Sequence, residues 1–105
     1  MKYGLMENTL ESIIDVFAKY LKIEKVLLYG SRAKGNFKKG SDIDLALVGK
    51  NMNIEDLNKI FLELDKLYLP YDFDLVIFEK IENENLIDHI NRIGITIYER
   101  SQNKK

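Results

Sequence analysis

Two small groups of residues in this 105-residue chain have the types and spacing that chemistry on phosphate requires. Gly30 and Ser31 follow the apolar run 26–29, where they offer a backbone without a Cβ and a hydroxyl beside N–H groups. Asp42 and Asp44 come after ten intervening residues and open a second apolar run. The first group suits a phosphate, and the second suits a hard cation such as Mg²⁺.

A phosphate-binding turn that faces two carboxylates predicts a site for a nucleoside triphosphate. Residues two apart on a strand point to the same side, so Asp42 and Asp44 are expected on one face. Ala46 continues that face, either as the floor of a cleft or as a packing position under a helix. A glycine-serine pair or a pair of aspartates alone would carry little weight, but their combination is much rarer.

Composition and charge narrow the class of protein. The formal net charge of −1 argues against direct nucleic-acid binding, because such proteins usually carry a large basic excess. The chain has no cysteine, which excludes disulfides and thiolate metal sites. Residues 1–4 lack the apolar core of a signal peptide, and no run reaches the length of a membrane span. We therefore expect a cytoplasmic protein with a small ligand or a protein partner.

Hydrophobic periodicity predicts the elements that hold these residues. Apolar positions at helical spacing predict helices over 8–21, 54–68 and 83–92, with a short helical turn at 32–36. Apolar runs predict strands over 25–29, 43–48, 73–78 and 95–98. This alternation indicates an α/β fold, a mixed sheet flanked by helices, in one domain over residues 1–100 with a polar tail at 101–105.

The motif resembles the signature of the minimal nucleotidyltransferases of the DNA-polymerase-β superfamily. That signature combines Gly30-Ser31 with Asp42-x-Asp44 and a third acidic residue on a later strand. The likeness extends over about residues 24–99, through the segments 32–35, 69–71, 93–94 and 98–99. It implies a polymerase-β-like fold in a single minimal domain. It also implies that the glycine-serine turn holds the β and γ phosphates and that Asp42, Asp44 and Asp74 bind metal, with two Mg²⁺ ions expected.

The third carboxylate has two candidates, Asp72 and Asp74, which fall on one face of the expected strand. Asp74 lies inside the apolar run, where a charge without a partner would be costly. Asp72 sits just after the Pro70 turn, where solvent can reach it. We therefore favour Asp74.

The basic residues near the motif divide into two groups. Arg32 and Lys34 lie beside the turn and are expected to help bind the nucleotide, although Lys34 stands where the family commonly has arginine. Lys38 and Lys39 lie on a loop, where a solvated surface is the default. His89 is expected to be a partly exposed structural residue on the last helix.

The resemblance implies Mg²⁺-dependent transfer of a nucleotide, AMP from ATP, onto a hydroxyl of an acceptor. Small members of this family pair with a helical HEPN-type protein, which implies a hetero-oligomer, a tyrosine of that partner as acceptor and an antitoxin role. The alternative is a weakly catalytic or non-catalytic nucleotide-binding subunit that neutralises or assists a helical substrate-binding partner. The intact set of Asp42, Asp44 and Asp74 favours the enzyme.

Overall fold

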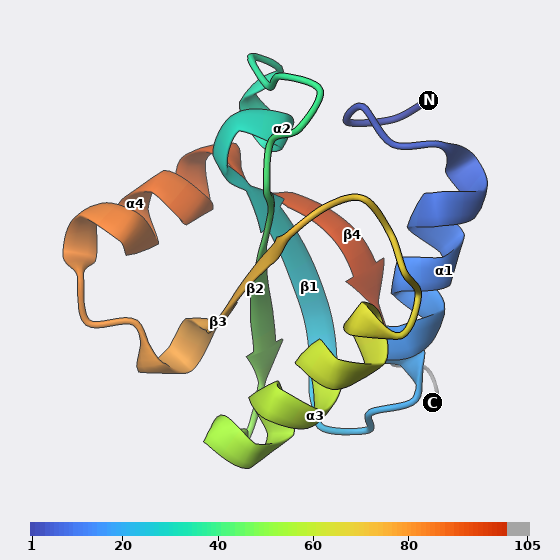
Figure 1. The fold of residues 1–105 in the computed structure, drawn as a ribbon. Coiled ribbons are helices and arrows are strands. Elements are labelled where there is room, and N and C mark those ends of the chain that lie inside the picture. The colour runs from blue at the N-terminus through green and yellow to red at the C-terminus, as the bar shows by residue number, and fades with distance from the viewer. Residues whose placement is uncertain (101–105) are drawn as a thin grey trace.

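The chain forms a mixed β-sheet with helices on both faces, and a computed structural model describes its residues 1–100 (Figure 1). The order of elements is α1 (Glu7–Ala18), β1 (Ile23–Tyr29), α2 (Gly30–Lys34), β2 (Ile43–Gly49), α3 (Ile54–Asp65), β3 (Phe73–Ile77), the short 3-10 helix η1 (Phe78–Lys80), α4 (Glu84–Ile93) and β4 (Ile95–Glu99). The strands lie in the order β3-β2-β1-β4. β1 is antiparallel to β2 and β4, and β2 is parallel to β3. The predicted fold class is confirmed.

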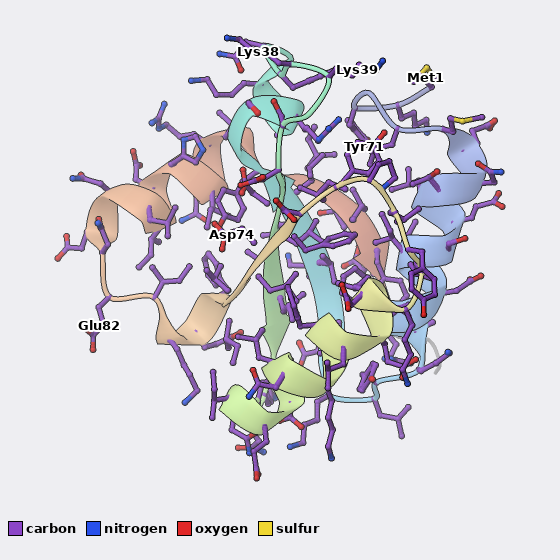
Figure 2. All side chains as sticks on the ribbon, viewed as in Figure 1. Met1, Lys38, Lys39, Tyr71, Asp74 and Glu82 are labelled. Atoms are coloured by element: carbon purple, nitrogen blue, oxygen red, sulfur yellow. The ribbon has the colours of Figure 1, made fainter. Side chains whose placement is uncertain are left out.

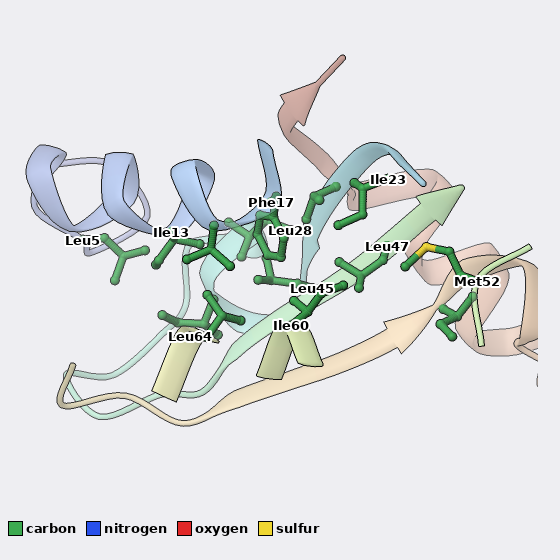
Figure 3. Packing of buried hydrophobic residues seen from close by; sticks show 14 residues of the cluster. Leu5, Ile13, Phe17, Ile23, Leu28, Leu45, Leu47, Met52, Ile60 and Leu64 are labelled. Atoms are coloured by element: carbon green, nitrogen blue, oxygen red, sulfur yellow. The ribbon is translucent and has the colours of Figure 1, made fainter. Parts of the chain in front are cut away.

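The main core lies between one face of the sheet and the helices α1 and α3 (Figure 3). Alternate residues of each strand point to this face, because successive side chains on a strand alternate between the two sides. Leu28 of β1 and Leu45 of β2 meet Phe17 of α1 and Ile60 of α3, and each of these four side chains is at most 1% exposed. Burying side chains of this size stabilises the fold by about 1.5–3 kcal/mol each.

The opposite face of the sheet is covered by α4 and holds a smaller apolar cluster. Tyr29 and Ala46 pack there with Ile90 of α4. Ala46 is fully buried, so it is a packing position under a helix and not the floor of an open cleft. Asp44 lies two residues before Ala46 on the same face and is partly exposed.

Two helices end earlier than the sequence predicts. α1 stops at Ala18, and Leu21, which the pattern assigned to the inward stripe, is 82% exposed. The guanidinium of Arg100 donates to the carbonyls of Ala18 and Tyr20, so a residue from the far end of the chain binds the carbonyls at this helix end. α3 stops at Asp65, and Tyr68, expected in its apolar stripe, is 90% exposed.

Other boundaries agree with the sequence or shift by a few residues. Asn53 and Asp56 form a capping box at the start of α3, as their three-residue spacing in the sequence indicates. The short helix expected at 32–36 starts two residues earlier, at Gly30. The tail at 101–105 lies outside the described residues, and the domain limit at residue 100 stays a prediction. Among the helices formed by residues 1–100, none is both long and apolar enough to span a bilayer.

Candidate active site

The register of three neighbouring strands sets Tyr29, Asp44 and Asp74 in a row across the sheet. Tyr29 of β1 is the Cα partner of Asp44 on β2, and Asp44 is in turn the Cα partner of Asp74 on β3. Asp44 and Asp74 lie on the α4 side of the sheet, opposite the main core, and Figure 2 labels Asp74 there. Residues paired across parallel strands lie close together, so two carboxylates meet on this face.

Gly30 is required at its position by the close approach of Asp44. Its φ of 74° lies in the left-handed region, which disfavours side chains. A Cβ built on Gly30 would collide with the Asp44 carboxylate oxygen Oδ2. The sequence indicated a tight turn or a close ligand here. The structure shows a tight turn pressed against the carboxylate itself.

Negative charge is concentrated around Asp44. Burial, the nearby Asp74 and the nearby Asp42 together raise the pKa of Asp44 from its ordinary value to about 6, and the positive charge of Arg32 opposes that rise. Asp42 precedes β2 and is exposed, yet it lies close enough to act on Asp44. Two of the predicted carboxylates, Asp42 and Asp74, therefore act electrostatically on the third, Asp44.

These carboxylates fit a divalent cation by their chemistry. Carboxylate oxygens are the ligands that Mg²⁺ prefers, and an ion placed among them would relieve the repulsion that raises the pKa of Asp44. In residues 1–100, no three His, Cys, Asp or Glu side chains are already gathered tightly enough to enclose an ion. Mg²⁺ sites commonly use only one or two carboxylates, with water and substrate phosphates completing the shell.

The turn into α2 is where the sequence predicts phosphate binding. The turn starts at Gly30, and the Ser31 hydroxyl makes no hydrogen bond to the protein within the described residues. Lys34, at the end of α2, is exposed. Lys38 and Lys39, which Figure 2 labels, are exposed on the loop that follows α2. Ser31 and Lys34 are therefore accessible to a ligand, and their binding roles stay predictions.

Arg32 is buried, whereas the sequence predicts an accessible cation beside the turn that helps to bind the nucleotide. Its side chain is 2% exposed, and its three nitrogens donate to the backbone carbonyls of Tyr3 and Ser41. Its guanidinium carbon also lies 5.3 Å from the centre of the Phe37 ring and 4.8 Å from that of Tyr71. These contacts hold Arg32 within the protein, so a direct contact with nucleotide stays a prediction that the geometry does not favour.

Two residues beside the carboxylates were not identified from the sequence as part of the site. Tyr29 is buried, and burial together with Asp74 and Asp44 raises the pKa of its phenol, which therefore stays neutral. His89 of α4 stands edge-on to Tyr29, with ring centres 6.1 Å apart and planes at 84°. Tyr29 immediately precedes Gly30, but only the pairing of β1 with β2 reveals that it neighbours Asp44.

A separate hollow lies at the edge of the sheet formed by β3. It has a volume of about 380 Å³, and none of the three carboxylates lines it. Its walls are mostly apolar and include Ile54, Leu57, Leu75 and Leu86. An apolar groove offers little to a triphosphate, so the site is placed by its charged groups rather than by the size of a hollow.

We predict that Asp44→Asn stabilises the metal-free protein at pH 7.5 and not at pH 4. The folded-state pKa of about 6 is raised, so the ionised carboxylate destabilises the folded protein above that pH. This destabilisation fades as the pH falls and is absent below the unfolded pKa, near 3.8. Thermal unfolding should show a midpoint raised by a few degrees, roughly, at the higher pH only.

The control for this measurement is Asp15→Asn, which neutralises an exposed carboxylate on α1. Its midpoint should change little and by the same amount at both pH values. Equal midpoints for Asp44→Asn and the unmodified protein at pH 7.5 would contradict the described electrostatics.

Comparisons with known proteins identify relatives of this chain and solved structures of similar fold. The candidate protein adenylyltransferase MJ0141 of Methanocaldococcus jannaschii is 28% identical over 79 residues, which cover 72% of this chain and 80% of that protein. A toxin–antitoxin structure solved with AMP-PNP has a TM-score of 0.70 at 21% identity, covering 93% of this chain and 77% of the other. The complex of a tri-AMPylated Shewanella oneidensis HEPN toxin with its MNT antitoxin has a TM-score of 0.68 at 17% identity, covering 91% and 74%.

At these identities, the two solved structures show only that the fold is similar. The family is shown by the model described as "Polymerase beta, Nucleotidyltransferase", which matches residues 11–103. The resemblance stated from the motif is confirmed. The chain belongs to the polymerase-β nucleotidyltransferase family, and it is a nucleotidyltransferase.

Proposed function

We propose that this protein transfers AMP from ATP to a hydroxyl group of a partner protein, in the cytoplasm. The observation that carries the proposal is the row of Asp44 and Asp74 on adjacent strands, with Gly30 pressed against Asp44. It joins a phosphate-binding turn directly to a pair of carboxylates. Phosphoryl transfer depends mainly on such positioning and on charge neutralisation.

In the proposed reaction the acceptor oxygen forms a bond to the α-phosphorus of ATP. The bond from that phosphorus to the bridging oxygen of the β-phosphate breaks, and pyrophosphate leaves. Gly30 and Ser31 would hold the leaving phosphates, with Lys34 supplying positive charge. Bound Mg²⁺, held by Asp42, Asp44 and Asp74, would neutralise phosphate charge and ease ionisation of the acceptor.

Asp74 is proposed to act on the acceptor side. It is exposed, whereas Asp44 is held between Tyr29 and Asp74, so an incoming hydroxyl reaches Asp74 more readily. A carboxylate in that place can ligate metal or accept the proton of the hydroxyl. The neutral phenol of Tyr29 would line the site without adding charge.

The partner is proposed to be a helical HEPN-type protein that is modified on a tyrosine, with this chain as the antitoxin of the pair. Support comes from the related folds, which include an MNT antitoxin in complex with a HEPN toxin that carries AMP groups. Further support comes from MJ0141, whose name gives it the same class of reaction. The two chains would form a hetero-oligomer, with the exposed Lys38 and Lys39 beside the interface.

We predict that ATP binds weakly without Mg²⁺ and that Asp42→Asn or Asp44→Asn removes most of the gain that Mg²⁺ gives. The reason is that Asp42 and Asp44 would hold the ion, which would neutralise the charge of the phosphates. Calorimetric titration with ATP, with and without Mg²⁺, measures this, and Asp15→Asn serves as the control. ATP affinity that is independent of Mg²⁺ in all four proteins would rule out the site.

The two acidic residues near the start of β3 should separate under mutation. Asp74→Asn should lower the rate of AMP transfer by about 10²-fold or more with ATP binding largely retained, because it acts on the acceptor. Asp72→Asn is the matched control, since Asp72 is also exposed but precedes the strand and has no such pairing with Asp44. The assignment is wrong if Asp72→Asn is the inactive variant.

The acceptor is tested by co-expression with the product of the neighbouring gene, followed by intact-mass measurement after incubation with ATP and Mg²⁺. We expect the partner to gain one or more AMP masses on tyrosine, and Asp42→Asn to abolish the gain. A stable complex without any adduct would instead support a nucleotide-binding subunit that acts by association alone. Absence of any complex would contradict both functions.

A further inference from the structure

We infer that Arg32 is a positioning residue that sets the distance between the phosphate-binding turn and the metal-binding carboxylates. The inference rests on the proposed function and replaces a direct contact of Arg32 with nucleotide. Among residues 1–100, Arg32 is the only charged side chain that is fully buried. Burying a charge costs free energy unless the charged group is hydrogen-bonded or otherwise stabilised. The contacts of this guanidinium therefore indicate why it is buried.

Arg32 holds both ends of the loop that separates the two halves of the motif. It stands on α2 directly after Ser31, and its Nε and Nη2 donate to the carbonyl of Ser41 at 3.2 and 2.8 Å. Ser41 directly precedes Asp42. Two bonds from one planar group to one carbonyl restrict both distance and direction, as a single bond from a flexible side chain cannot.

The same guanidinium reaches two further segments. Nη1 donates to the carbonyl of Tyr3 at 2.9 Å, which ties down the start of the chain. The ring of Tyr71 lies against the guanidinium, and Tyr71 comes three residues before Asp74. Figure 2 labels Tyr71 on the segment that leads into β3, the strand that carries Asp74. One buried side chain thus contacts the segments that carry Ser31, Asp42 and Asp74.

The groups that stabilise the buried positive charge of Arg32 indicate why an arginine is needed at this position. No carboxylate forms an ion pair with Arg32 within the described part of the chain. Backbone carbonyls and the faces of Phe37 and Tyr71 stabilise the charge instead. A lysine would keep the charge, but its compact ammonium lacks the fork and stacks less well on both rings.

The N-terminal segment provides an independent way to disturb this arrangement. Gly4 has a φ of 78°, and a Cβ at this position would lie 2.7 Å from Nη1 of Arg32 and against the ring of Phe37. Gly4→Ala should therefore displace the guanidinium although Gly4 is remote in sequence from every site residue. Gly40→Ala controls for the addition of a Cβ in open space, because a Cβ there meets no atom within 4 Å.

The experiment measures ATP affinity with and without Mg²⁺ in the full chain for Arg32→Lys, Gly4→Ala, Gly40→Ala and Arg92→Lys. Arg92 lies exposed on α4 and controls for exchange of arginine by lysine. We expect Arg32→Lys to reduce the gain in affinity from Mg²⁺ by about 10-fold, with metal-free affinity changed by less than about twofold. Gly4→Ala should also reduce the gain in ATP affinity from Mg²⁺. The controls Gly40→Ala and Arg92→Lys should show the same gain as the unmodified protein.

Circular dichroism and thermal unfolding confirm that each variant is folded at the temperature of the titration. A further variant, Arg32→Gln, removes the charge. If metal-free ATP affinity falls in Arg32→Gln and is retained in Arg32→Lys, Arg32 contacts phosphate directly and the inference is overturned. The inference is also overturned if Arg32→Lys and Gly4→Ala are folded and Mg²⁺ raises their ATP affinity as much as it does in the unmodified protein. If the unmodified protein shows no gain from Mg²⁺, the proposed function fails instead.

Discussion

The register of β2 between β1 and β3 is the constraint on which both the core and the site depend. Leu45 and Leu47 point into the main core and are fully buried, while Asp44 and Ala46 point to the other face. Because side chains alternate along a strand, a slip of one residue would turn Asp44 into the main core and move the leucines to the α4 face, where the apolar cluster is smaller. Each buried leucine contributes about 1.5–3 kcal/mol, so the core enforces the arrangement despite the repulsion around Asp44.

Gly30 links that register to the chemistry. The turn after β1 can approach β2 only because Gly30 has no Cβ to meet the Asp44 carboxylate. The group that would hold phosphate and the group that would hold metal are thereby in contact before any ligand binds. Binding of a metal–nucleotide complex would then require little rearrangement of the backbone, which is the form of pre-organisation that favours transfer chemistry.

Much of this fold was predictable because its signals are local. The strands around the motif carry apolar runs, and the capping box at Asn53 can be recognised within four residues. The end of α1 is predicted too late, since periodicity continues past Ala18 while contacts to the carbonyls at this end come from Arg100, far along the chain. Helix ends fixed by distant residues are not visible in a local pattern.

The site was predictable in its residue types and less so in its contacts. Asp74 was favoured over Asp72 for an assumed burial, yet its side chain is exposed, and its pairing with Asp44 is what distinguishes it. Arg32 and Lys34 look alike in sequence as cations beside a turn, but one is buried among carbonyls and the other faces solvent. The strand pairing separates Asp74 from Asp72, and the burial of the side chain separates Arg32 from Lys34.

The most direct test of the account is a crystal structure of this chain with Mn²⁺ and a non-hydrolysable ATP analogue. Anomalous scattering would locate the metal, and the phosphates would be visible beside it. We predict manganese at the carboxylates of Asp42 and Asp44, with the terminal phosphates on the turn at Gly30 and Ser31. Manganese and phosphates bound away from these residues, for instance with the nucleotide in the apolar groove at β3, would contradict the central claim.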